Sequence, residues 1–336
     1  MATLKDVAAR ANVSFSTVSR AINEPGRVNA DTRARVEEAI RHLRYTPHRA
    51  ARRLRGRSTH AQIFGLLIPD IENPFYSGIV RGVEDRAYAE GYAVILSNTN
   101  EDLDRERFYL DVLRQEAAAG AILPPLSDGS PVPYHPDALG FPVVCFDRRP
   151  EIDGLDTVVV DNEQGAFDAV SHLIGLGHRR IGLVVASLDL STSRERADGY
   201  RRALREHDVP VAEELVRTGE PRKEAGQTLS LDLLQSADRP TALFAGNNVM
   251  AMGALTAAQA LGLRIPDDLS VVGFDDPPWV ELVTTPLTTV RQPAYEIGRT
   301  AADLLLQRVA DPDRASSVVV LPTTLVVRAS CAAPGA

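Results

Sequence analysis

The feature that most constrains the fold is a series of short apolar runs, separated by amphipathic stretches, that begins after Gln62. The first four runs lie at residues 63–69, 94–96, 121–123 and 143–146, with helical stretches at about 75–90 and 103–118. Apolar runs of this length that alternate with helices indicate parallel strands covered on both faces.

The pattern then restarts. The second set of runs lies at 157–160, 181–185, 242–244 and 271–272, with helices expected near 163–177, 194–208, 223–235 and 249–262. Two such sets predict two similar lobes. No glycine-rich phosphate loop follows any of these strands, which argues against a dinucleotide-binding enzyme.

Charge divides the chain into two unequal parts. Residues 1–60 carry thirteen basic and five acidic side chains, a net charge of +8, whereas the whole chain has −8 and the remainder therefore −16. A basic head on an acidic body is typical of a protein in which only the head meets a polyanion. Charge alone leaves open a merely solvated basic surface.

A first helix is predicted to begin after Thr3, which is placed as its N-cap with Asp6 three residues further on. One face is apolar at helical spacing and consists of Leu4, Val7, Ala8 and Ala11. Residues 12–14 interrupt this pattern. We expect a tight turn there.

The second helix is expected over about residues 16–23, with Ser14 as its cap. Val18 and Ile22, four residues apart, direct it toward the first helix. Its outer surface is then polar and consists of Ser16, Thr17, Ser19 and Arg20. Two short helices joined by a tight turn, with a polar outer face on the second, fit the major groove of DNA.

A third helix over about residues 31–43 is expected to begin with Asp31 as a cap. Its apolar positions are Val36, Ile40 and Leu43, which complete a three-helix core. The segment 48–56 follows, with four arginines and almost no apolar face. Because a helix this short is marginal in water, we expect it to order only against DNA and a second copy of the chain.

These motifs resemble the DNA-binding head of the LacI/GalR repressor family. The matching stretches are TLKDVA at 3–8, NVS at 12–14, TVSR at 17–20 and IN at 22–23, and Ala51, Arg52 and Leu54 match the family's hinge helix. We therefore predict a helix-turn-helix head at 1–46 and a hinge helix and linker at 47–60. A small helical protein-binding module is the alternative.

The resemblance implies which residues read bases. Phe15, Ser16 and Arg20 lie at the matching positions, and Arg20 would pair bidentately with a guanine. A phenylalanine at position 15 departs from the commoner tyrosine or polar residue, which favours contact with a thymine methyl group or a sugar.

Other DNA contacts implied by the resemblance are not to bases. Phosphate contacts are expected from Thr17, Asn23 and Asn29. Leu54 would wedge into the minor groove at the operator centre and kink the duplex. The predicted DNA-binding set is Thr3, Phe15, Ser16, Thr17, Arg20, Asn23, Asn29, Arg52, Leu54 and Arg55.

The body resembles the sensor domain of the same family, which is similar to periplasmic sugar-binding proteins. The matching stretches include NPF at 73–75, DN at 161–162, LGHRRI at 176–181, GFDD at 273–276 and PLTTVRQP at 286–293. The implied fold is α/β, a type I two-lobed body of parallel sheets that binds effector and dimerises through residues 61–336. Lobe 1 would span about 61–160 and 293–320, and lobe 2 about 161–291 and 321–330.

The resemblance places an effector cleft at the carboxyl ends of the strands, where open α/β sheets bind ligands. Carboxylates and arginines there suit a hydroxyl-rich ligand, because they accept and donate hydrogen bonds in fixed pairs. The predicted effector contacts are Phe75, Asp147, Arg148, Asp161, Arg196, Asn248, Asp275 and Trp279. Structural roles stay open for Asp147 or Asp161 as caps, Arg196 as a surface charge and Trp279 as a packing residue.

Nothing in the sequence predicts catalysis, a cofactor or a metal. Serine and histidine do not occur together in a nucleophile-elbow setting, and no His, Cys and carboxylate cluster has metal-ligand spacing. Asp275 and Asp276 are interpreted as a ligand acceptor beside a turn residue rather than a magnesium site. Cys145 and Cys331 fit free thiols in a reducing compartment.

The chain is expected to be a soluble, cytoplasmic homodimer without membrane contact. Charged residues interrupt the apolar stretches of the first twenty residues, and no run of 18 apolar residues occurs. Two-fold symmetric DNA is read by matched heads, which requires a dimer. Residues 326–336 contain no leucine heptad, so the four-chain assembly of some relatives is not expected.

The sequence therefore predicts a sequence-specific transcriptional regulator, most simply a repressor of carbohydrate-utilisation genes. It would bind a pseudo-palindromic operator in double-stranded DNA, under allosteric control by a sugar or sugar derivative. One alternative is a purine, nucleoside or other corepressor, although Pro221 stands where some purine-binding members carry an aromatic residue. The other is a transport-type solute-binding protein, which would have an export signal and no basic head.

Overall fold

The computed structural model describes residues 3–23, 25–43, 63–126 and 136–335. The chain forms two compact units, Met1–Thr59 with the head and His60–Ala336, the body. We describe each unit by itself. The predicted hinge, including Arg52, Leu54 and Arg55, lies outside the described residues.

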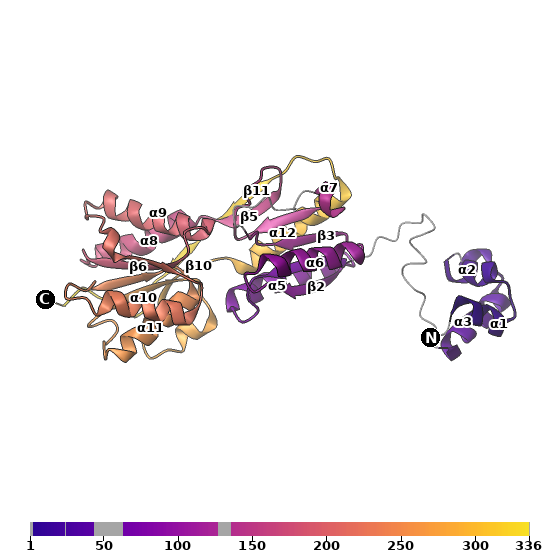
Figure 1. The fold of residues 1–336 in the computed structure, drawn as a ribbon, viewed down its shortest axis with the longest axis horizontal. Helices are drawn as coiled ribbons and strands as arrows, with labels where there is room; N and C mark the ends of the chain where they lie inside the picture. Colours follow the sequence, from indigo (N-terminus) through magenta and orange to yellow (C-terminus); the bar gives the residue numbers. More distant parts are fainter. Residues whose placement is uncertain (1–2, 24, 44–62, 127–135, 336) are drawn as a thin grey trace. The chain divides into compact units, whose positions relative to one another are not determined.

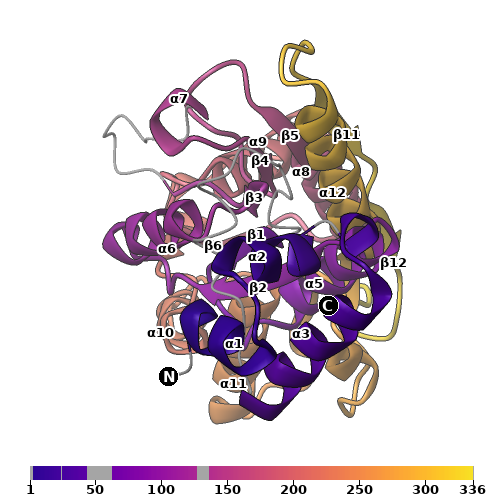
Figure 2. The ribbon, with the colours of Figure 1, turned by 90° about the vertical axis from the view of Figure 1, so that its right-hand side faces the viewer.

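The head is a set of three short helices that pack together (Figure 2). Its elements are α1 (Leu4–Ala11), α2 (Phe15–Asn23), the 3-10 helix η1 (Pro25–Arg27) and α3 (Ala30–Leu43). The buried core takes apolar side chains from each of the three α-helices, namely Val7, Ala8, Ala11, Val18, Ala21, Val36 and Ala39. The predicted apolar faces of all three helices are confirmed.

Local hydrogen bonds explain where two of these helices begin. Thr3 and Asp6 form a reciprocal capping box, in which the Thr3 backbone N–H donates to Asp6 Oδ2 at 2.7 Å. Ser14 Oγ accepts from the backbone N–H of Thr17 at 3.1 Å at the start of α2. Both caps agree with the sequence prediction.

The cap of α3 differs from the prediction. Asn29 Oδ1 accepts from the backbone N–H of Thr32 at 2.8 Å, and Asp31 lies within the first helical turn. Asp31 was therefore wrong as the cap. Its carboxylate instead lies near the positive end of the helix dipole, which also stabilises a helix start.

The body contains two six-stranded sheets, one in each lobe (Figure 1). The lobe 1 sheet has the order β11-β5-β4-β3-β1-β2 and consists of β1 (Ile63–Ile68), β2 (Ala93–Asn98), β3 (Gly120–Leu123), β4 (Val143–Phe146), β5 (Asp156–Val160) and β11 (Val318–Leu321). All its neighbouring strands are parallel. The apolar pattern assigned 157–160 to the second set of strands, whereas the family resemblance placed it in lobe 1. The first assignment is corrected here, because β5 pairs with β4.

The lobe 2 sheet repeats this arrangement. It has the order β12-β10-β9-β8-β6-β7 and consists of β6 (Ile181–Ala186), β7 (Val216–Gly219), β8 (Ala242–Ala245), β9 (Ser270–Phe274), β10 (Thr288–Arg291) and β12 (Thr324–Val326). Only β12 runs antiparallel to its neighbour, β10. The chain crosses between the lobes three times, after β5, after β10 and after β11.

Helices cover both faces of each sheet. In lobe 1, α5 (Pro74–Ala89) and α12 (Ala294–Ala310) cover one face, and α6 (Leu103–Gln115) and α7 (Pro136–Leu139) the other. In lobe 2, α8 (Asn162–Gly175) and α9 (Ser191–Glu206) cover one face, and α10 (Lys223–Leu234) and α11 (Asn248–Ala260) the other. The 3-10 helices η2 (Glu213–Leu215) and η3 (Pro278–Glu281) lie in loops. The prediction of two similar, doubly covered lobes is confirmed.

The contact between α5 and α12 depends on glycine. A Cβ at Gly82 would collide with the carbonyl of Tyr295, and one at Gly298 with the carbonyl of Ile79. The two helix backbones therefore touch, and α12 is held on lobe 1 although it follows all but one of the lobe 2 strands in the sequence.

Candidate effector cleft and DNA-binding face

A cleft of about 830 Å³ lies between the two lobes of the body. Five of the predicted effector residues line it: Phe75, Asp147, Arg148, Arg196 and Asp275. Phe75 belongs to α5, the pair Asp147 and Arg148 follows β4, Arg196 lies on α9, and Asp275 follows β9. The strand ends of both lobes therefore converge on one cavity.

Asp147 is a buried carboxylate of lobe 1 with a left-handed backbone, φ 63°. No residue in the described ranges donates a hydrogen bond to this carboxylate, and Arg148 Nε lies 3.9 Å from Oδ2. Burial raises the pKa of Asp147 to about 6, against the opposing effect of Arg148 and Arg196. The carboxylate therefore keeps free acceptor capacity inside the cleft.

Arg148 is held by a carboxylate of its own lobe. Its two terminal nitrogens donate to Glu101 at 2.8 and 2.5 Å in a bidentate pair. Burial alone would lower the pKa of Arg148, but Glu101 outweighs it and the pKa lies above its ordinary value. The cation is therefore permanently charged and fixed in place.

Arg196 is the corresponding cation of lobe 2, and it is buried. Its Nε donates to Asn162 Oδ1 at 2.9 Å, and Nη1 donates to the carbonyl of Gly246 at 2.6 Å. The guanidinium lies 3.8 Å from the centre of the Phe274 ring. These contacts orient Arg196, but none of them is with a carboxylate, so they do not neutralise its charge.

Asp275 is the lobe 2 counterpart of Asp147, with φ 72°. Its Oδ2 accepts from the backbone N–H of Asn248 at 3.1 Å, and Oδ1 accepts from Gln292 Nε2 at 2.6 Å. Asn248 Nδ2 in turn donates to Asn73 Oδ1 of lobe 1 at 2.7 Å. Each carboxylate oxygen of Asp275 therefore accepts one hydrogen bond, which fixes its orientation.

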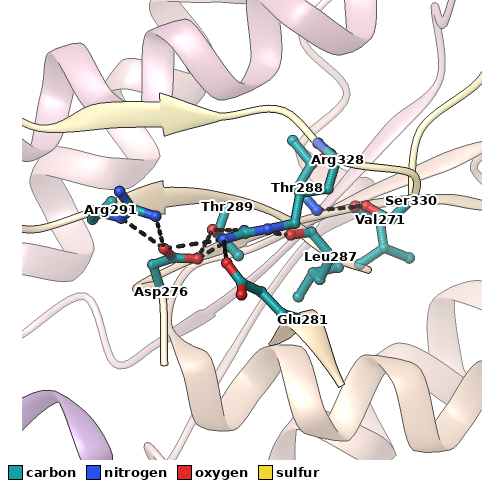
Figure 3. A network of polar contacts seen from close by, with 9 residues as sticks. All are labelled: Val271, Asp276, Glu281, Leu287, Thr288, Thr289, Arg291, Arg328 and Ser330. Carbon is teal, nitrogen blue, oxygen red and sulfur yellow. Dashed lines mark hydrogen bonds and ion pairs between the residues drawn. The ribbon is translucent and has the colours of Figure 1, made fainter. Parts of the chain in front are cut away.

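Asp276 is not among the residues that line the cleft, and it holds Arg328 in a network of polar contacts (Figure 3). It accepts from Thr289 and Arg291, and its Oδ1 accepts from Arg328 at 2.8 Å. Burial alone would raise the pKa of Asp276, but these hydrogen bonds outweigh burial and the pKa lies below its ordinary value. Asp276 was predicted as a turn residue beside a ligand acceptor; it instead joins β10 to Arg328, a contact between positions distant in sequence.

Three predicted residues are not among those that line the cleft. Asp161 is exposed and caps α8, its Oδ1 accepting from the backbone N–H of Gln164 at 2.9 Å. Trp279 packs on the core between α10, α11 and the lobe 2 sheet. Asn248 lies one hydrogen bond behind Asp275. We therefore retain Asn248 as a supporting residue and drop Asp161 and Trp279 from the site.

The sequence prediction missed several residues that line the cleft. The lining that carries polar or aromatic groups also includes Tyr76, Glu101, Thr192, Ser193 and Gln292. Tyr76 directly follows the family-like stretch 73–75, and Thr192 and Ser193 lie one helical turn before Arg196. Their closeness in sequence to predicted cleft residues could have indicated that they also line the cleft.

In the head, α2 presents an exposed polar face with Phe15, Ser16 and Arg20. Phe15 is 45% exposed, unusual for a phenylalanine in a small domain. Ser19, predicted on this outer surface, is instead buried, and this expectation is corrected.

The side chains of Ser14, Ser16 and Thr17 form a hydroxyl cluster at the start of α2, with oxygen–oxygen distances of 2.8 Å. The side-chain oxygen of Asn29 accepts the hydrogen bond that caps α3, and its phosphate contact stays a prediction. Asn23 ends α2.

Within the described ranges, no helix is long and apolar enough to cross a membrane. No group of three or more His, Cys, Asp or Glu side chains there is arranged to hold a metal ion.

Comparison with known proteins decides the family. Residues 3–48 match the model of the bacterial regulatory proteins of the lacI family, and residues 170–331 match that of a periplasmic binding protein-like domain. The HTH-type transcriptional repressor PurR of Pectobacterium atrosepticum is 36% identical over 340 residues, which cover 99% of this chain and 97% of the relative. The chain belongs to the LacI family.

Solved structures of LacI-family proteins share the whole architecture. The complex of the transcriptional regulator CelR with cellobiose has a TM-score of 0.75 and 32% identity, covering 98% of this chain and 100% of that one. The lac repressor dimer bound to operator and the anti-inducer ONPF has a TM-score of 0.79 and 29% identity, covering 99% of both chains. This LacI-family chain is a DNA-binding transcriptional regulator, not an enzyme.

Proposed function

We propose that this regulator is a cytoplasmic, homodimeric repressor released from, or fixed on, its operator by an uncharged, hydroxyl-rich effector. The observation that carries the proposal is the convergence of Asp147, Arg148, Arg196 and Asp275 from two lobes on one cleft. Such paired acceptors and donors match the hydroxyl groups of a sugar.

The charge of the cleft argues for a neutral effector. Seven acidic and four basic side chains line it. Of the cations, Arg148 is neutralised by Glu101, and Arg222 lies 3.3 Å from Glu220. A phosphorylated sugar or a nucleotide would face uncompensated carboxylates, whereas a sugar ring would stack its C–H face on Phe75.

A purine or nucleoside is the second candidate, because a relative with 36% identity is named PurR. Against it, the aromatic residues of the lining, Phe75 and Tyr76, both come from α5, and Pro221 stands on the lobe 2 side. A flat base would then stack on one lobe only.

A thermal-shift panel tests the effector class. Ribose, cellobiose, glucose 6-phosphate, hypoxanthine and cytidine are offered to the wild-type chain, and we expect a neutral sugar to raise the melting temperature. Arg196→Gln should abolish that shift, because the cleft loses the buried, oriented cation of lobe 2 that no carboxylate neutralises. Asp161→Asn is the matched control and should keep the shift, since asparagine also caps helices and position 161 lies outside the lining. A shift by the phosphorylated sugar alone would overturn the proposal.

A mobility-shift assay tests the operator-reading residues, with duplexes from the promoter regions that flank the gene. Arg20→Ala should lower specific binding by about 1–3 kcal/mol, or roughly fivefold to 150-fold, and relax sequence preference. Arg33→Ala removes the same charge from α3 and should weaken specific and random duplexes alike. Equal affinity of the wild-type chain for every duplex would contradict specific binding.

A further inference from the structure

Beside the cleft, Arg149 of lobe 1 contacts α9 of lobe 2 in two ways. Its backbone N–H donates to Ser191 Oγ at 3.0 Å, and its Nε donates to Glu195 Oε1 at 2.9 Å. Ser191 and Glu195 lie one turn apart on α9. Arg149 of lobe 1 therefore binds one helix of lobe 2 through both its backbone and its side chain.

Glu195 is also connected to the cleft. Its second oxygen, Oε2, accepts from Asn162 Nδ2 at 2.8 Å, and Asn162 Oδ1 accepts from Arg196 Nε at 2.9 Å. Asn162 is 1% exposed and Arg196 5% exposed, so solvent does not compete for this part of the chain of contacts. Glu195 thus helps to fix the orientation of the cleft cation.

Arg149 is equally close to the cleft on the lobe 1 side. It lies two residues after Asp147, and Arg148 between them is held by Glu101. The turn is tight, since the backbone N–H of Arg148 donates to the carbonyl of Phe146 at 2.6 Å. Any displacement of Asp147 must therefore move Arg149.

We propose that Arg149, Ser191 and Glu195 form an interlobe latch that couples occupancy of the cleft to the approach of the two lobes. Glu195 acts in it as a positioning residue for Arg196. The coupling rests on the proposed function, because it requires an effector that touches Asp147 or Arg196. Since binding free energies are reciprocal, opening the latch must change effector affinity as much as the effector changes the latch.

The expected size of the effect follows from exposure. The side chains of Arg149 and Glu195 are 43% and 25% exposed, so water and salt weaken the pair. Opening the latch should change the measured constants by about twofold to fivefold.

Amide hydrogen exchange of the full chain, without added small molecule, decides whether the latch holds the lobes. Arg149→Ala and Glu195→Gln should each speed exchange by about twofold to fivefold in two separate segments, 147–152 and 190–197. The effect of the double variant should be smaller than the sum of the two single effects, because both changes disturb the shared Arg149–Glu195 contact and only Glu195→Gln also disturbs the bond from Asn162. Glu206→Gln, on the same helix and paired only within lobe 2, should leave both segments unchanged.

Unchanged exchange in either segment, or additive single effects, would overturn the latch. The coupling is read with cellobiose and cytidine as titrants: Arg149→Ala and Glu195→Gln should change the Kd of the one that binds, and Glu206→Gln should not. Binding that is identical in all variants would overturn the coupling. If neither compound binds the wild-type chain, the proposed effector class is at fault, and the exchange data alone decide the latch.

Discussion

The two lobes present the same carboxylate on the same backbone frame and use it differently. Asp147 and Asp275 each follow a buried phenylalanine at a strand end, and each donates its backbone N–H to the next strand at 2.9 Å. Both have positive φ. In lobe 2 the carboxylate is held by Asn248 and Gln292, whereas within the described ranges the lobe 1 carboxylate receives no hydrogen bond.

The comparison shows that repetition of a fold does not repeat the energetics of its site. A carboxylate whose acceptors are already satisfied locally stabilises the protein, and one whose acceptors are unused is costly until a ligand supplies donors. We therefore expect lobe 2 to orient the effector on a preformed surface. Lobe 1 should gain more stability when the effector binds, because the effector then donates hydrogen bonds to Asp147.

The largest expected effect concerns a buried carboxylate that does not line the cleft. Asp156 of lobe 1 is completely buried and accepts from Arg308, Arg314 and the backbone N–H of Ser317. Asp156→Ala leaves two arginines without their partner and should destabilise the chain by about 3–5 kcal/mol in urea unfolding. The lobe 2 change Asp276→Ala should cost less, because Arg291 is half-exposed and Arg328 keeps Glu281. Equal losses of stability in the two variants would contradict this difference between the lobes.

Next in size is Asp147→Asn. The folded pKa of about 6 lies above the ordinary 3.8, so ionisation costs stability as the pH rises through 6. The variant should match the wild-type chain near pH 4 and exceed its stability by up to about 3 kcal/mol above pH 7. Unfolding midpoints across pH 4–8 measure this. A gain that does not depend on pH would show that the carboxylate is not the cause.

Asp275→Asn should have the opposite sign. The amide offers only one acceptor to the two donors, and its own NH2 group then faces Asn248 or Gln292. We expect a loss of about 1–3 kcal/mol at pH 7, measured in the same titration. Stabilisation here would abolish the contrast between the two positions.

The smallest effects should come from ion pairs on the outer helices. Glu213→Gln breaks a bidentate pair with Arg201 in lobe 2, where the carboxylate is 62% exposed, and Asp303→Asn breaks a pair with Arg86 in lobe 1. Hydrogen bonding to Arg201 holds the pKa of Glu213 below its ordinary value, so its contribution is present at pH 7 and lost as the pH falls through that lowered pKa. Each variant should cost about 0.2–1 kcal/mol at pH 7. A loss above that range in one lobe only would point to a buried network there.

The strands with continuous apolar runs were predictable, because both faces of β1, β3, β4, β6 and β8 are covered and only apolar side chains fit there. Burial does not explain every missed strand, because β10 is largely buried, but the missed strands that lie at sheet edges have exposed positions. Edge strand β7 is half-exposed and contains Arg217 and Thr218, and β11 exposes Val318 and Val320. The missed helix α12 does show helical spacing at Ile297, Ala301, Leu304 and Leu305, so its sequence held the signal.

The cleft was predictable as far as strand ends and motif positions specify it. Asp147 and Asp275 are dictated by their place after a buried strand. The partners of the cleft residues are not, because Glu101, Asn162 and Gln292 meet Arg148, Arg196 and Asp275 only through the packing of elements distant in sequence. In the sequence, Asp161 could not be distinguished from a cleft residue, because a carboxylate that follows a strand suits both a helix cap and a ligand contact.

The three crossings between the lobes have a consequence for protein synthesis. Lobe 1 begins with β1 at Ile63, but α12, which supplies Ile297 and Leu305 to its core, and its edge strand β11 leave the ribosome only after most of lobe 2. During translation, α5 alone therefore covers that face of the nascent first lobe until lobe 2 is almost complete. A chain interrupted between residues 294 and 321 loses the lobe that was started first.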